Sequence, residues 1–104
     1  MRLQYTYIIE GEFQAMEYKN YIVHKVSLHN LERKLPTNPI ITGSVSIKND
    51  SKIVCIMEGE EQDLNSLRKE IERGPVIAHI FNIDFSKTQY SGRYQSFISK
   101  KHYH

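Results

Sequence analysis

The amino-acid sequence predicts a two-layer α/β fold, in which two helices cover one face of a single antiparallel β-sheet. Three observations predict it: several segments of alternating apolar residues, two segments with helical spacing, and a helix signal closed by Gly74-Pro75. The chain has 104 residues, of which 39% are hydrophobic and 25% charged, as is ordinary for one globular domain. We therefore expect residues 1–104 to form a single domain.

Turn residues separate the periodic segments, so the elements can be placed in order along the chain. The predicted elements are a strand over residues 3–9, a loop over 13–17, a helix from Tyr18 to 33–35 ended by Pro36, a hairpin of strands over 41–48 and 53–57, a turn at Gly59, a helix over 60–73, a strand over 76–85, a polar connection over 86–93 and a short strand over 94–99. This β-α-β-β-α-β order with an extra C-terminal strand predicts a ferredoxin-like sandwich.

The second helix has the clearest signals. Leu64, Leu67 and Ile71 recur at spacings that place them on one face. Acidic residues lie in its first turn and basic residues later, which suits the helix dipole. Gly74 can take the left-handed backbone conformation that ends a helix, and the following proline cannot continue it.

Charge and cysteine content bound the cellular setting. The net charge is +2, but residues 86–104 hold four basic residues and no acid, and we expect residues from about 100 to 104 to be a basic, mobile tail. Cys55 lies alone in an apolar alternating run, which indicates a buried strand residue rather than a nucleophile. The N-terminus has no signal-peptide core and no apolar run could span a bilayer. We expect a cytoplasmic protein without membrane contact.

Four short motifs together resemble one family. Gly11-Glu12-Phe13-Gln14-Ala15-Met16-Glu17-Tyr18-Lys19 is similar to the acylphosphatase motif Gly-x-Val-Gln-Gly-Val-x-Phe-Arg. Gly43-Ser44-Val45-Ser46-Ile47 is similar to that family's Gly-Trp-Val-x-Asn. Glu58-Gly59 and Gly74-Pro75 match its Glu-Gly and Gly-Pro. The resemblance covers most of the chain and implies the ferredoxin-like fold and hydrolysis of acyl phosphates without a cofactor.

The resemblance also implies where such a site would lie. It assigns the backbone of five residues to a phosphate cradle, namely Gln14, Ala15, Met16, Glu17 and Tyr18. Lys19 stands where the family has the arginine that holds the phosphoryl group, and it lacks the two-pronged guanidinium. Ile47 stands where the family has the asparagine that positions the attacking water. The substitutions predict that hydrolysis is weak or lost, with a small acyl phosphate or another anion as the implied ligand.

Asn49 offers a possible replacement for the missing amide. It lies two residues beyond Ile47 and, if the pairing is regular, on the same side of the strand, about 6–7 Å along it. A shift of register is needed to bring it to the site.

A non-catalytic module that binds a protein, an anion or nucleic acid is the alternative function. The segment after residue 86 mixes aromatic rings with cations that can contact phosphates, namely Lys87, Arg93, Lys100 and Lys101. The competing interpretation is that Tyr94 or Phe97 packs into the sheet while the lysines are solvated. A flavin-binding light-sensor domain shares the same order of elements, but the Gly74-Pro75 spacing favours acylphosphatase.

We expect no metal site. His24 and His29 are five residues apart on the first helix, about 140° around it, so they cannot form a metal pair. His79 lies alone in a strand, and His102 and His104 could chelate only weakly from a terminus.

Overall fold

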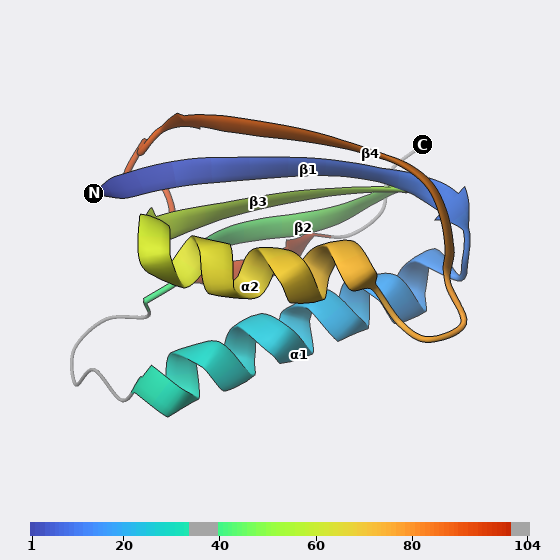
Figure 1. The fold of residues 1–104 in the computed structure, drawn as a ribbon, viewed down its shortest axis with the longest axis horizontal. Helices are drawn as coiled ribbons and strands as arrows, with labels where there is room; N and C mark the ends of the chain where they lie inside the picture. The colour runs from blue at the N-terminus through green and yellow to red at the C-terminus, as the bar shows by residue number, and fades with distance from the viewer. Residues whose placement is uncertain (34–39, 101–104) are drawn as a thin grey trace.

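The protein forms two layers, with both helices on one face of a five-stranded sheet (Figure 1). The structure is a computed structural model that describes residues 1–33 and 40–100. The elements are β1 (Arg2–Glu12), α1 (Ala15–Arg33), β2 (Thr42–Asn49), β3 (Lys52–Glu60), α2 (Glu61–Arg73), β4 (His79–Gln89) and β5 (Phe97–Lys100). The predicted ferredoxin-like order with an extra C-terminal strand is confirmed.

The strands lie in the order β4-β1-β3-β2-β5. The first four pair antiparallel, as predicted, but β5 pairs parallel to β2, so the sheet is mixed. The connection after β4 explains this difference. It crosses the sheet at the end where β4 stops. β5 must therefore run in the direction opposite to β4, and β2 also runs in that direction.

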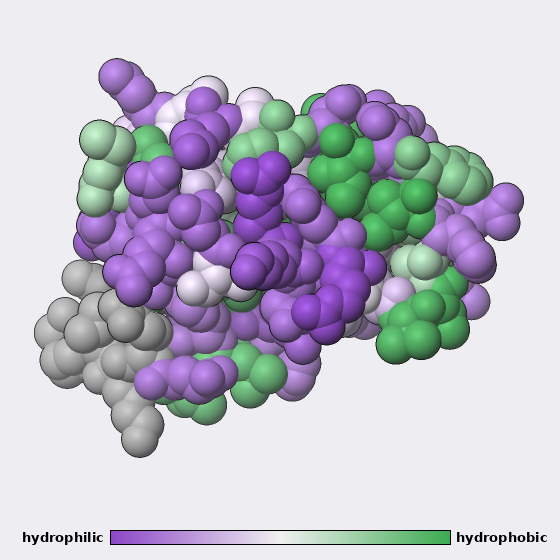
Figure 2. Space-filling model, in the orientation of Figure 1, coloured by the Kyte–Doolittle hydropathy of each residue, from purple (hydrophilic) through white to green (hydrophobic). Residues whose placement is uncertain are grey.

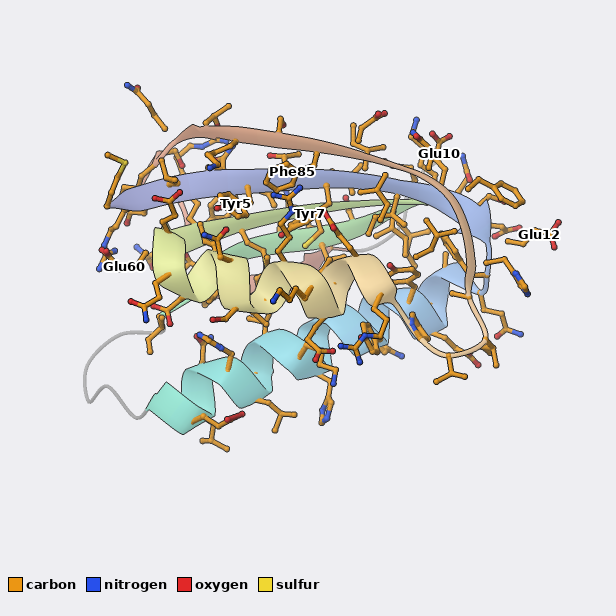
Figure 3. All side chains as sticks on the ribbon, in the orientation of Figure 1. Tyr5, Tyr7, Glu10, Glu12, Glu60 and Phe85 are labelled. Atoms are coloured by element: carbon orange, nitrogen blue, oxygen red, sulfur yellow. The ribbon has the colours of Figure 1, made fainter. Side chains whose placement is uncertain are left out.

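The core lies between the sheet and the helices, because alternate residues of each strand point to the helix-covered face. Tyr5, Tyr7 and Ile9 of β1 are fully buried there, and Figure 3 shows both tyrosines with Phe85 on this face. The predicted face of α2 is buried against them, namely Leu64, Leu67 and Ile71. Tyr18, Ile22 and Val26 of α1 are buried there as well. Cys55 is also buried, as its place in an alternating run predicted.

Several predicted boundaries are wrong, because pairing partners far away in the sequence set them. β1 continues to Glu12, since Gly11 and Glu12 pair with Ile80 and His79. The expected loop over 13–17 shrinks to two residues, and α1 begins at Ala15 rather than Tyr18. No turn occurs at Gly59, because β3 runs to Glu60 and α2 starts at the next residue.

The last two strands also differ from the prediction. β4 spans His79–Gln89 rather than 76–85, because its polar second half pairs with β1 up to Leu3. β5 starts at Phe97 rather than at residue 94. Lys100 is the last residue of β5, and residues 101–104 of the predicted tail lie outside the described residues.

Glu58 holds the connection that carries the chain from β4 to β5. Its side chain is fully buried and accepts hydrogen bonds from the Ser91 N–H (2.8 Å), the Ser91 hydroxyl (2.6 Å) and the Gly92 N–H (3.2 Å). A carboxylate can be buried at this position because several donors surround it. The bonds fix the crossing loop over the end of the sheet.

Tyr18 joins the two helices at the other end of the molecule. Its hydroxyl donates a 2.7 Å hydrogen bond to the Ile71 carbonyl oxygen in the last turn of α2. This turn would otherwise leave carbonyl groups without partners. Gly74 follows with φ of 69°, and a Cβ atom at this residue would lie 2.8 Å from the Tyr18 hydroxyl oxygen. Gly74 therefore meets two demands, a positive φ and close approach to Tyr18.

We expect Gly74→Ala to lower the free energy of unfolding by about 1–3 kcal/mol, because the methyl group is strained by the positive φ and displaces Tyr18. Gly92→Ala is the matched control. Gly92 has φ of 72°, but its nearest neighbour would be the exposed ring of Tyr90 at 3.3 Å, so only the backbone cost of about 1 kcal/mol is expected. Urea unfolding of both variants measures the difference, and equal losses would contradict the role given to Tyr18.

A candidate ligand pocket at the start of the first helix

The β1–α1 connection and the β2–β3 turn meet at one end of the molecule, on the right in Figure 1. The Gly11 N–H donates a 3.1 Å hydrogen bond to the Ser51 carbonyl oxygen and ties the turn to the end of β1. The Tyr18 N–H donates to the Gln14 carbonyl oxygen at 3.0 Å, which closes the first turn of α1. These bonds fix the backbone on both sides of a cavity.

The cavity has a volume of about 490 Å³ and is open to solvent. Its lining residues are Phe13, Gln14, Ala15, Met16, Ile47 and Asp50. Ala15 and Ile47 are buried, whereas Met16 is 55% exposed. The walls are therefore mainly apolar, with one amide and one carboxylate.

The structure brings together four of the residues assigned by the resemblance. Gln14, Ala15 and Met16 line the cavity from the start of α1, and Ile47 lines it from β2. Ala15 and Met16 lie in helical backbone, so the local conformation does not depend on glycine.

The other three predicted residues do not line the cavity. Glu17 is exposed, and Lys19 is half-buried one turn further along α1. Tyr18 is fully buried and packs into the core, with its ring centroid 5.0 Å from that of Phe13. Its contribution to the site is structural, because it holds the start of α1 in place.

Asn49 lies outside the cavity. The β2–β3 pairing does shift register between Ile47 and Asn49, yet Asn49 is not among the residues that line the cavity. The Asn49 side-chain oxygen accepts a 2.8 Å hydrogen bond from the Ser51 N–H within the turn. Asn49 thus stabilises the turn and leaves Ile47 as the β2 residue beside the cavity.

Sequence reasoning missed Phe13 and Asp50 as lining residues. Phe13 is part of the quoted motif, but its position there indicated a loop residue and not a residue that lines a cavity. Asp50 indicated only a turn. The contact between the turn and β1, through Gly11 and Ser51, brings Asp50 to the cavity. No local pattern reveals a contact between residues so far apart in the chain.

The described part of the predicted nucleic-acid segment spans both edges of the sheet. Lys87 lies on β4 and Lys100 on β5, which form opposite edges. The Lys87 ammonium nitrogen lies 3.3 Å from a Glu61 carboxylate oxygen. The Arg93 guanidinium carbon lies 5.7 Å from the centroid of the Tyr94 ring. Lys101 lies outside the described residues. Lys87 and Lys100 therefore do not form one surface, although they are near each other in the sequence. Nucleic-acid binding stays a prediction.

Apolar residues are also exposed near the cavity end. Figure 2 shows apolar side chains gathered on the right, over β4 and the connection that follows α2. The most exposed are Val76, Ile77 and Phe81, each more than 60% accessible. Glu10 and Glu12 lie at the same end (Figure 3). Neither helix in the described part of the chain is long and apolar enough to cross a membrane.

The sequence motifs and the fold resemble those of acylphosphatases, and comparison with known proteins agrees. The acylphosphatase family model matches residues 5–99. An acylphosphatase from Helicobacter hepaticus is 26% identical over 83 residues, which cover 80% of this chain and 81% of that protein. The chain belongs to the acylphosphatase family.

Solved structures share the fold. The crystal structure of acylphosphatase from Bacillus subtilis has a TM-score of 0.76 at 17% identity, with 94% of this chain and 98% of that chain covered. Klebsiella pneumoniae BlrP1, solved with FMN and cyclic diGMP, has a TM-score of 0.66 at 20% identity, covering 97% of this chain and 26% of that chain. At these identities the likeness establishes the fold alone, and the family model carries the assignment.

We expect Cys55 to resist thiol reagents in the native protein. The side chain is fully buried, and burial raises the pKa of its thiol, so the reactive thiolate is scarce. Labelling with a disulfide reagent should be about 10³-fold slower than in denaturant, since it requires the protein to open. Rapid labelling of the folded protein at neutral pH would show that Cys55 is accessible.

Proposed function

We propose that this protein is an acylphosphatase-family domain in which hydrolysis of acyl phosphates is weak or absent and the cavity serves to bind a ligand. A single observation carries the proposal. Ile47 lines the cavity together with Gln14, Ala15 and Met16, in the place where the resemblance puts the asparagine that positions water. We propose a cytoplasmic setting for this role.

Ile47 removes a hydrogen-bonding group from the reacting centre. The activity implied by the resemblance is attack of water on phosphorus, with release of a carboxylate and phosphate. A butyl side chain can neither donate to the incoming water nor accept its proton, and it displaces water from its own surface. Loss of one preorganised polar group in an active site typically costs about 10²–10³ in rate.

The cationic side of the site is weakened as well. Lys19 stands at the family's arginine position, carries a point charge in place of a planar fork, and does not line the cavity. Asp50 does line it and would repel an approaching phosphoryl group. The first turn of α1 still presents N–H groups and a positive helix end. These backbone groups alone support weak anion binding rather than turnover.

The expected hydrolysis of an aromatic acyl phosphate such as benzoyl phosphate is barely above the uncatalysed rate. Because Ile47 and Lys19 each lack a needed group, the double variant Ile47→Asn, Lys19→Arg should hydrolyse benzoyl phosphate at least about tenfold faster than the wild type. The measurement is the loss of the acyl phosphate absorbance with purified protein.

Ser46→Asn is the matched control for the added amide. Ser46 neighbours Ile47 on β2, and successive strand residues point to opposite faces, so this amide faces away from the cavity. Wild-type turnover on the order of 1–1000 per second would refute the proposal. A rate gain in Ser46→Asn equal to that of the double variant would show that the effect does not come from the cavity.

A further inference from the structure

We propose that the cavity binds a small organic cation, an alkyl or aryl ammonium whose apolar body lies on Phe13, Met16 and Ile47 and whose charge faces Asp50. This inference rests on the proposed function, since it assigns a ligand class to the same cavity. At about 490 Å³ the volume is within the range of small-molecule pockets. Four of the six lining residues are apolar, so the cavity offers a surface for hydrocarbon rather than for a hydrated phosphate.

Asp50 decides the sign of the ligand's charge. Among the described residues that line the cavity, it is the only charged one. Its carboxylate is exposed and makes no ion pair with the described part of the chain. A ligand ammonium can therefore pair with it without breaking an existing contact. A carboxylate or phosphate in the same position would be repelled.

The helix end beside the cavity opposes a cation, so the two effects must be compared. The start of α1 carries about half a positive elementary charge. Glu17 and Lys19 both lie outside the cavity lining, and their opposite charges offset each other. Asp50, at the cavity itself, carries a full negative charge against the half charge of the helix end, so a monocation is favoured.

Phe13 adds a second attraction for an ammonium group. It is half-buried at the cavity wall, and the Tyr18 ring packs against it at 66° between planes, which restricts its orientation. Ammonium groups are attracted to the faces of such rings, more strongly where water is partly excluded. The Met16 thioether, which also lines the cavity, is polarisable and adapts to different hydrocarbon shapes. The cavity thus combines a ring, a flexible apolar wall and one carboxylate.

Three probes with the same six-carbon body separate charge from apolar contact, namely hexylammonium, hexanol and hexanoate. Each is titrated at neutral pH against the wild-type chain, and backbone amide shifts of residues 13–16 and 47–50 are followed by NMR. We expect hexylammonium to bind in the millimolar range, about three- to tenfold more tightly than hexanol, with hexanoate the weakest. Equal binding of all three, tightest binding of hexanoate, or shifts confined to other residues would overturn the inference.

Asp50→Asn tests the source of the preference, because it keeps the shape of the side chain and removes its charge. The preference for hexylammonium over hexanol should fall to about twofold or less, while hexanol affinity stays within a factor of two. Asp84→Asn is the matched control, since Asp84 is an exposed carboxylate on β4 that does not line the cavity. Loss of the preference in Asp84→Asn, or its retention in Asp50→Asn, would contradict the role of Asp50.

The ligand titration and the hydrolysis assay test the two proposals separately. A chain that hydrolyses benzoyl phosphate fast refutes the proposed function, whatever the amine result. A chain that neither hydrolyses the acyl phosphate nor prefers hexylammonium refutes only the cation inference and leaves the loss of catalysis standing.

Discussion

The hydrogen bond from the Tyr18 hydroxyl to the Ile71 carbonyl oxygen, 2.7 Å long, is the constraint on which the cavity depends. It satisfies a carbonyl at the end of α2 and fixes the first turn of α1, one residue after Glu17 and three after Ala15. Gly74 leaves room for the ring, and Phe13 packs on its other side. The backbone that frames the cavity is therefore held from the core, by a residue that does not line it. Burial raises the pKa of the Tyr18 hydroxyl, so it stays protonated and able to donate at any physiological pH.

The buried Glu58 side chain fixes the backbone at the opposite end of the molecule. Glu58 anchors the chain crossing from β4 to β5 through three hydrogen bonds, and this lets the last strand join the far edge beside β2. Both contacts use polar atoms that are fully satisfied, which a low-dielectric interior requires. Neither involves a cavity-lining side chain. These hydrogen bonds of the scaffold therefore do not depend on the side chains that line the cavity.

The sequence predicted the fold well because hydrophobic periodicity records which face of each element is buried. Leu64, Leu67 and Ile71 illustrate this, since their spacing alone placed them in the core. The boundaries at Glu12, Glu60 and Gln89 were missed, because cross-strand partners extend a strand through polar residues that have no local signal. The cavity was half predictable. The resemblance assigned Ile47 and residues 14–16 to one site, whereas Asp50 reaches the cavity through a long-range contact and Asn49 is held in the turn by its own hydrogen bond.

One substitution connects the proposed loss of hydrolysis with the apolar surface of the cavity. An attacking water must be held in place by polar groups, and the same groups make a site unfavourable for hydrocarbon, because they have to be desolvated when it binds. Ile47 reverses both conditions. It removes the group that would hold the water, and it completes a wall with Phe13 and Met16 that gains free energy when hydrocarbon replaces water. A residual anion site at the helix end and an apolar cation site cannot both be strong. The Asp50 carboxylate attracts a cation and repels an anion. The charge selectivity of the cavity therefore reports directly on which chemistry it has kept.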